Sequence, residues 1–313
     1  MGNKKKNNKK SLNKTSTTTT TAISNNSEVN GADKMQELFN PLTNLTAEQI
    51  EIFNKFKNNI TQLELTDREK EWIDDMLICR YLRARDYDLE LAYNLFLGTL
   101  EWRKTFKPYE ISAEELAHEA STGKSYVYGK SLGRSCIYLT PSRENTKNYE
   151  KQIKLLVYNI ERAISQMDKI QGHEQLVLVI DFNGYSIFNA PPMNVSKQTL
   201  DILSNHYPER LGQAILVDPP MIFNIFFKAI SPFINKQTYK KIHFASGSKG
   251  ITKTFTELFD LDKVSKEYGG NSDFKFSHPQ FWSEEIKMSR KERGLSELTD
   301  QEILDIIDNC KKD

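Results

Sequence analysis

A nearly unbroken apolar run, QLVLVID at residues 175–181, is the feature that most constrains the fold of this 313-residue chain. Five successive apolar residues without polar alternation are typical of a strand that is covered on both faces. Two similar runs follow, QAILVD at 213–218 and KIHFAS at 241–246. Helical patterns separate these runs, and such alternation predicts a mostly parallel sheet with right-handed crossovers.

The elements around these runs complete a predicted α/β fold. A further strand is expected at CIYLT, residues 136–140. The residues between and after the strands have helical spacing or helix-start signals. Helices are expected at residues 146–167, 195–206 and 252–259, and a further helix is expected to begin at the Pro219-Pro220 pair.

The first part of the chain predicts helices alone, from residue 46 to residue 106. The sequence Thr66-Asp-Arg-Glu69 is a capping box ahead of apolar residues at helical spacing up to Tyr81. Asp88 is expected to cap a second long helix, and Ser112 to begin a short third one. The sequence therefore predicts a disordered basic tail at 1–34, a helical subdomain at 46–122, an α/β domain at 123–275, and a charged, helical tail at 276–313.

Charge and cysteine content limit the class of protein. Residues 1–27 carry six lysines and no acid, which leaves 37 basic against 42 acidic residues in the remainder. A body with this balance argues against nucleic-acid binding, which depends on clustered positive charge. Three widely spaced cysteines, no signal-peptide region and no apolar run of about 20 residues predict a cytoplasmic protein.

None of the motifs in the chain predicts catalysis or metal binding. The segment GKSYVYGKS (123–131) has five residues between Gly123 and Gly129, where a phosphate-binding loop has four. The five histidines lack metal-ligand spacing, and Asp181 is interpreted as a turn cap. We therefore expect no enzyme activity, no metal and no cofactor.

The segment PPMIFNIFFKAISPF (219–233) has an unusual distribution of polarity. Its polar residues Asn224, Lys228 and Ser231 form one thin stripe, and apolar residues cover the rest. A helix that is apolar nearly all round is deeply buried, touches lipid or covers a cavity. Ordinary core packing and a cavity cover both remain open on this pattern.

Three polar residues are expected to meet at one edge of the sheet. Glu209 precedes the strand at 213–218, Lys241 begins the strand at 241–246, and Thr238 lies three residues earlier. Neighbouring parallel strands begin at the same edge, so these side chains should converge. A carboxylate accepts hydrogen bonds from hydroxyl groups, whereas Lys and Thr donate to phosphate, so the set suits a polyol phosphate. The alternative is a plain surface ion pair of Glu209 with Lys241 or Arg210.

Several longer motifs resemble the CRAL-TRIO family of lipid-binding and phosphatidylinositol-transfer proteins. They are ICRYLRARDYDLELAYNLFLGTLEWRK (78–104), VIDFNG, YPERLGQAILVDPPMIF, ISPFINKQTYKKI and EYGG, in the family's order and spacing. The resemblance covers roughly residues 66–275. It implies a mixed sheet that floors a deep apolar pocket beneath a mobile gate helix, here at residues 223–230.

The resemblance also implies site residues. Lipid-headgroup contacts are expected from Arg85, Glu209, Thr238 and Lys241. The expected gate and acyl-chain pocket residues are Tyr126, Leu176, Leu178, Ile222, Phe223, Phe226, Phe227 and Ile230. Two departures from the family pattern stand out: Asp86 replaces a Lys, and Leu176 and Leu178 stand where choline-lipid binders have Ser and Thr.

The function implied is that of a carrier. The expected cargo is phosphatidylinositol, moved between membranes or presented to other enzymes by a monomer that contacts membranes transiently. The alternative is a carrier or sensor of a small apolar molecule, such as a sterol precursor or a tocopherol-like compound. In that case membrane phosphoinositides would be contacted only at the protein surface.

Overall fold

The computed structural model describes residues 39–309 except 187, 189 and 235, without the side chains of residues 224, 226, 230 and 233. The tail expected at residues 1–34 lies outside the described residues. The chain divides after Gln36, so every described element belongs to the unit of residues 37–313. Each described helix is too short or too polar to span a lipid bilayer.

The first helices begin at residues whose side chains satisfy free backbone N–H groups. Thr46 and Thr66 each form a reciprocal capping box, with Gln49 and Glu69 respectively. One long helix was expected after Thr66, but the chain becomes extended at Ile73 and Asp74 caps a new helix by accepting from the Leu77 N–H. The helices are α1 (Ala47–Ile60), α2 (Asp67–Trp72), α3 (Asp75–Arg83), α4 (Leu89–Phe106) and the short α5 (Ala113–Leu116).

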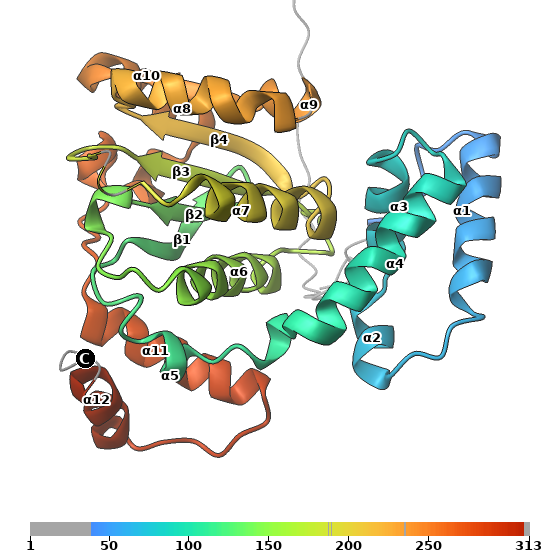
Figure 1. The fold of residues 1–313 in the computed structure, drawn as a ribbon, viewed down its shortest axis with the longest axis horizontal. Coiled ribbons are helices and arrows are strands. Elements are labelled where there is room, and N and C mark those ends of the chain that lie inside the picture. The colour runs from blue at the N-terminus through green and yellow to red at the C-terminus, as the bar shows by residue number, and fades with distance from the viewer. Residues whose placement is uncertain (1–38, 187, 189, 235, 310–313) are drawn as a thin grey trace, which may run out of the picture. The chain divides into compact units, whose positions relative to one another are not determined.

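Five strands form one mixed sheet, and they lie side by side in chain order (Figure 1). The first pair is antiparallel and the other three pairs are parallel, which confirms the predicted fold class. The first strand runs through the 123–131 segment, which carried no strand expectation. The strands are β1 (Ser125–Ser131), β2 (Arg134–Leu139), β3 (Leu176–Asp181), β4 (Leu211–Val217) and β5 (Ile242–Ala245).

The helices that connect the parallel strands lie on one face of the sheet. Successive right-handed crossovers between adjacent strands must all fall on the same side. Leu176 on β3 therefore packs in the cluster of the connecting helices, whereas its neighbour Val177 packs with Phe255 on the other face. The connecting helices are α6 (Tyr149–Ser165), α7 (Met193–His206), α8 (Met221–Ile230) and α9 (Lys236–Tyr239), and α10 (Gly247–Leu258) covers the other face.

The last helices, α11 (His278–Glu292) and α12 (Asp300–Asn309), extend the core. Trp282 on α11 is fully buried, and its indole N–H donates to the carbonyl of Ala113 at 2.8 Å. The hydroxyl of Tyr158 on α6 donates to Glu285 at 2.9 Å. The charged C-terminal segment therefore covers α5 and α6 with a buried apolar face.

Candidate binding cavity

A cavity of about 480 Å³ lies between the sheet and its crossover helices. This volume falls within the range of about 300–1,000 Å³ that is usual for small-molecule sites. Most of its lining is apolar. The apolar lining residues are Ala84, Ile160, Leu176, Leu178, Ile180, Leu200, Leu203, Pro208, Leu211, Ala214, Leu216, Phe223, Phe227, Ile234 and Ile242.

The floor of the cavity follows from the alternation of side chains along strands. Leu178 and Ile180 on β3 face the same side because they are two residues apart. Their register partners on β4 are Ala214 and Leu216, and Ala214 is in turn the partner of Ile242 on β5. These five side chains line the cavity, and the apolar run that predicted β3 thus supplies part of the floor.

Helix α8 forms one wall of the cavity through two phenylalanines. Phe223 and Phe227 are four residues apart, so they share one face of the helix, with ring centroids 5.8 Å apart. Phe223 contacts Phe182 at 4.4 Å between centroids, and Phe227 contacts Phe244 at 5.8 Å. The segment expected to be either core or cavity cover therefore covers a cavity.

Not every apolar residue of α8 lies where it was expected. Ile222 was expected among the gate and acyl-chain pocket residues, and it lies on α8, but it is 40% exposed and does not line the cavity. Met221 and Ile225 are still more exposed, at 86% and 67%. The side chains of Phe226 and Ile230, also expected in the pocket, lie outside the described part of the structure.

Arg85, Glu209, Thr238 and Lys241 also line the cavity, and the last three lie close together at the end where β4 and β5 begin. The ammonium of Lys241 donates to the carbonyl of Leu211 at 2.8 Å and lies 3.7 Å from the Glu209 carboxylate. The structure thus brings together the four residues for which sequence predicted headgroup contacts. Their assignment to a headgroup stays a prediction.

Two local features bring Lys241 and Glu209 to this end. Because β4 and β5 are parallel, their first residues share one edge of the sheet, and the Lys241 carbonyl accepts from the Ala214 N–H at 2.8 Å. The Lys241 N–H donates to the Thr238 carbonyl at 3.0 Å, which ties α9 to the strand. Glu209 has a φ of +57°, a left-handed conformation that costs a non-glycine residue about 1 kcal/mol or more.

Arg85 reaches the cavity from the turn that follows α3. Its N–H donates to the Leu82 carbonyl at 3.1 Å, and the next two residues, Asp86 and Tyr87, have positive φ angles. Its guanidinium donates to the Ala84 carbonyl at 2.9 Å. The turn therefore presents the Arg85 side chain to the cavity.

Glu174, which the sequence analysis did not single out, holds α3 in this position. Its carboxylate pairs with Arg80 at 3.0 Å and also with Arg83, and its carbonyl accepts from Arg210 at 2.8 Å. Burial, with Arg80 nearby, lowers the pKa of Arg210 to about 9. The spacing of Arg80 and Arg83 places them on one helix face, and this pattern could have indicated a shared acidic partner. No local pattern in the sequence indicates that the partner is Glu174.

Tyr126, another expected pocket residue, lies elsewhere. It packs on the opposite face of the sheet, stacked on its register partner Tyr138 at 5.4 Å and against Phe276 at 5.0 Å. Burial raises its pKa above the ordinary value of 10. The alternation along β1 places Val127, not Tyr126, on the side of the crossover helices.

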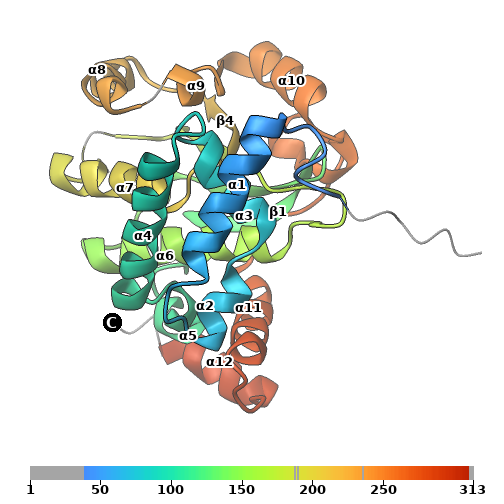
Figure 2. The same ribbon diagram turned by 90° about the vertical axis from the view of Figure 1, so that its right-hand side faces the viewer.

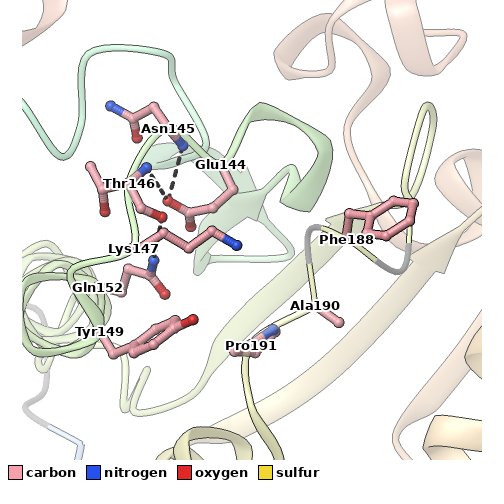
Figure 3. Close-up of a pocket in the computed structure, with 9 residues that line it drawn as sticks. All are labelled: Glu144, Asn145, Thr146, Lys147, Tyr149, Gln152, Phe188, Ala190 and Pro191. Atoms are coloured by element: carbon pink, nitrogen blue, oxygen red, sulfur yellow. Dashed lines mark hydrogen bonds between the residues drawn. The ribbon is translucent and has the colours of Figure 1, made fainter.

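A smaller and more polar hollow, of about 270 Å³, lies between the loop that precedes α6 and the residues Phe188, Ala190 and Pro191 (Figure 3). The carboxylate of Glu144 accepts from the N–H groups of Asn145 and Thr146, both at 3.0 Å, and pairs with the buried Lys124 at 2.6 Å. These contacts fix the loop. Within the described residues, no cluster of His, Cys, Asp and Glu could hold a metal ion.

Comparison with known proteins identifies two domains. The CRAL/TRIO domain model matches residues 120–270, and the CRAL/TRIO N-terminal domain model matches residues 34–98. The chain is also similar to the crystal structure of Sfh5, with a TM-score of 0.61, at 18% identity over 75% of this chain and 91% of that one. At this identity, the likeness concerns the fold.

Three curated relatives are similar over most of this chain. A CRAL-TRIO domain-containing protein of Schizosaccharomyces pombe is 32% identical over 80% of this chain, but the match spans 25% of that protein. Phosphatidylinositol transfer protein PDR17 of Saccharomyces cerevisiae is 28% identical over 71% of this chain and 65% of its own length. SEC14 cytosolic factor of Kluyveromyces lactis is 26% identical over 80% of this chain and 88% of its own length.

The match to this chain therefore spans a quarter of the length of the S. pombe protein and somewhat under two thirds of the length of PDR17. The N-terminal domain match falls on the helical region of the structure, and the second match falls on the sheet and its helices. Together the two matches cover most of the described residues. From these matches, the chain belongs to the CRAL/TRIO family.

Proposed function

We propose that this protein binds phosphatidylinositol in the cavity and carries it between membranes or presents it to other enzymes. The observation that carries the proposal is the composition of the cavity. Apolar side chains line most of it, while the charged or hydroxyl side chains of Arg85, Glu209, Thr238 and Lys241 also line it. An amphipathic lipid has the same division between its chains and its headgroup.

The apolar lining would replace water around the acyl chains. Exposure of each methylene to water costs about 0.8 kcal/mol, so two chains of about sixteen methylenes cost about 25 kcal/mol when both are fully exposed. Spontaneous escape of such a lipid from a bilayer is therefore slow. A cavity walled by Phe223 and Phe227 lowers this cost, and transient contact with the membrane surface avoids it during loading.

The polar end would hold the headgroup. The Lys241 ammonium has three donors, of which one serves the Leu211 carbonyl, so donors remain for a phosphate. Arg85 adds a guanidinium, with no carboxylate within 4.0 Å of it in the described part of the chain, and Thr238 adds a hydroxyl. The Glu209 carboxylate accepts from ring hydroxyls, which distinguish inositol from choline.

The proposal concerns a carrier and not an enzyme, so the lipid leaves chemically unchanged. We propose that the carrier acts as a monomer in the cytoplasm and touches membranes transiently. The names of two relatives, a phosphatidylinositol transfer protein and a cytosolic factor, support this reading.

A second candidate is a carrier or sensor of a small apolar molecule. The observation that favours it is the cavity volume of about 480 Å³, together with the leucines at positions 176 and 178 in its floor. Such a volume is usual for drug-sized ligands.

Mass spectrometry of lipids that co-purify with the full chain tests both candidates. Phosphatidylinositol enriched over its share of the total cell extract is the expected result. A single sterol-like or prenyl compound in place of phospholipid would replace the proposal with the second candidate. Recovery of lipids in the proportions of the cell extract would contradict both.

A further inference from the structure

A separate polar pocket lies where the N-terminal helices meet the ends of α6 and α7. Helix α4 lies beside the end of α7 in both views (Figures 1 and 2), and the Thr99 hydroxyl on α4 donates to the Asn205 carbonyl on α7 at 2.9 Å. The volume of the pocket is about 90 Å³, which is room for several water molecules. We call it the arginine pocket, after the lining side chains of Arg80, Arg103 and Arg210, which Lys169 and Tyr81 accompany.

One of the four cations in the arginine pocket, Arg210, has no carboxylate partner within 4.0 Å in the described part of the chain. Its Nη1 donates to the Glu174 carbonyl at 2.8 Å and to the Met167 sulfur at 3.7 Å. The N–H groups on its Nε and Nη2 have no acceptor among the described residues. The other cations are paired, Arg80 with Glu174 at 3.0 Å, Arg103 with Glu161 at 2.6 Å and Lys169 with Asp74 at 2.8 Å.

The surroundings of Arg210 disfavour its positive charge. Burial, followed by the charge of Arg80, lowers the pKa of Arg210 to about 9. A negative charge beside this guanidinium would raise that pKa again and stabilise the folded chain. Glu71 also lines the pocket, but its side chain is exposed, so water and salt screen its charge. The pocket therefore contains an uncompensated cation.

The hydroxyl of Tyr81 gives independent evidence for a ligand. Tyr81 is 2% exposed and lines the pocket, yet its hydroxyl has no hydrogen-bond partner among the described residues. A buried hydroxyl without a partner is unfavourable, so an acceptor in the pocket would stabilise it. Burial raises the pKa of Tyr81 to about 12, although the charges of Arg80, Arg103 and Arg210 oppose this rise. The hydroxyl is thus protonated at neutral pH and able to donate.

We propose that the arginine pocket binds a small free oxyanion such as inorganic phosphate, held by the Arg210 guanidinium and the Tyr81 hydroxyl. A tetrahedral oxyanion accepts from both groups at once, and guanidinium matches its geometry. A water molecule would satisfy Tyr81 but would leave the charge of Arg210 uncompensated. A volume of about 90 Å³ is too small for a nucleotide or a lipid. The proposal does not rest on the cargo of the lipid cavity, although Tyr207, Pro208 and Arg210 line both spaces.

Calorimetric titration of the full chain with inorganic phosphate tests the proposal, with chloride at equal ionic strength as the reference. We expect one phosphate site per chain. Tyr81→Phe keeps the buried ring and should weaken phosphate binding about tenfold or more, because it removes a hydrogen bond to a charged ligand. The matched control is Tyr93→Phe. Both tyrosine rings contact Phe96, at 5.8 and 6.0 Å between centroids, but Tyr93 does not line the pocket, so its variant should bind phosphate as the wild type does.

The melting temperature gives a second measurement on the same proteins. Without phosphate, Tyr81→Phe should melt no lower than the wild type, since the hydroxyl that it loses has no partner among the described residues. Phosphate should raise the melting temperature of the wild type and of Tyr93→Phe more than that of Tyr81→Phe. Failure of the wild-type chain to bind phosphate at millimolar concentrations would overturn the proposal, as would equal phosphate affinity in Tyr81→Phe and the wild type.

Lys241→Ala separates this pocket from the lipid cavity. Lys241 lines the lipid cavity and not the arginine pocket, so the variant should bind inorganic phosphate with wild-type affinity. Tyr81→Phe should in turn retain its co-purified phospholipid. Phosphate binding that is lost in Lys241→Ala and kept in Tyr81→Phe would place the anion in the lipid cavity and contradict the proposal. Loss of phospholipid from Tyr81→Phe would do the same, because it would assign the pocket to a lipid phosphate.

Discussion

The ammonium of Lys241 lies 3.7 Å from the carboxylate of Glu209, at the starting edges of the parallel strands β5 and β4. Both side chains are about a quarter exposed. As a simple surface ion pair, this contact would contribute about 0–1 kcal/mol to stability. As part of a headgroup site, it would matter far more to ligand binding than to folding. The two interpretations therefore predict different results for the same substitution.

Lys241→Ala should reduce the affinity for phosphatidylinositol by about tenfold or more, because a hydrogen bond to a charged group contributes about 1.5–3 kcal/mol. The fold should remain intact, since the side chain accounts for one hydrogen bond to the Leu211 carbonyl. Transfer of labelled phosphatidylinositol between vesicles measures the effect, and urea unfolding measures stability. The control Lys151→Ala removes an exposed lysine of α6 that does not line the cavity. Transfer at the wild-type rate by Lys241→Ala would remove the headgroup assignment.

Ala214→Leu and Ala245→Leu form a matched pair on opposite faces of the sheet. Ala214 lines the cavity, whereas Ala245 is fully buried in the cluster that contains Phe255. A larger side chain at 214 should occupy ligand space and lower lipid affinity about tenfold with little loss of stability. At 245, it should overpack the core and cost about 1–3 kcal/mol. Urea unfolding and lipid content measure the two effects. Equal destabilisation by both variants would show that no usable space lies above Ala214.

Glu174→Ala should destabilise the protein by about 3–5 kcal/mol, because it removes the carboxylate partner of the buried Arg80. Phosphatidylinositol affinity should also fall, since the pairs with Arg80 and Arg83 hold the turn that carries Arg85. The matched control is Glu150→Ala, whose exposed pair with Lys154 should contribute less than about 1 kcal/mol. Denaturant unfolding distinguishes them, and similar midpoints for the two variants would contradict the role given to Glu174.

His206 should make stability depend on pH. Its ring stacks on Trp102 at 4.4 Å between centroids, and burial lowers its pKa below the ordinary 6.5. The unfolded chain therefore binds a proton more readily than the folded chain. The free energy of unfolding should fall as pH drops below 6.5 and should be unaffected by this group above that value.

His206→Phe keeps an aromatic ring against Trp102 and removes the titration. The loss of melting temperature between about pH 7.5 and about pH 5.5 should be smaller in this variant than in the wild type. Carboxylates that titrate in the same range affect both proteins alike, so the difference isolates His206. An identical loss in both proteins would contradict the prediction.

Long patterns with one period predicted the fold well. The apolar runs at β3 and β4 are covered on both faces, so their sequences carry no polar alternation and cannot be mistaken for loops. Strand β1 was not predicted because a bulge between Val127 and Lys130 interrupts the alternation of its side chains. The break between helices at Ile73 was not predicted because the helical spacing of apolar residues continues across it. Only one side-chain hydrogen bond, to Asp74, marks the start of α3.

The sequence correctly placed those site residues whose position depends only on the order and direction of the strands. Glu209 and Lys241 converge because parallel strands share an edge, and that rule needs no side-chain detail. The placement of Tyr126 depended on which face of a strand turns inward, where one residue of offset reverses the answer. The placement of Ile222 depended on which face of α8 turns inward. Glu174 acts through residues distant in sequence, so no local pattern indicates it.

The cavity lies between the strands and the connections that join them, with α7, α8 and α9 as its walls. A residue inserted into a strand would reverse the facing of every side chain beyond it. A residue exchanged or added in a connection leaves the pairing of the strands in place and changes the walls of the hollow. The strand ladder thus fixes the floor of the hollow, while its walls belong to segments that can diverge without breaking that ladder.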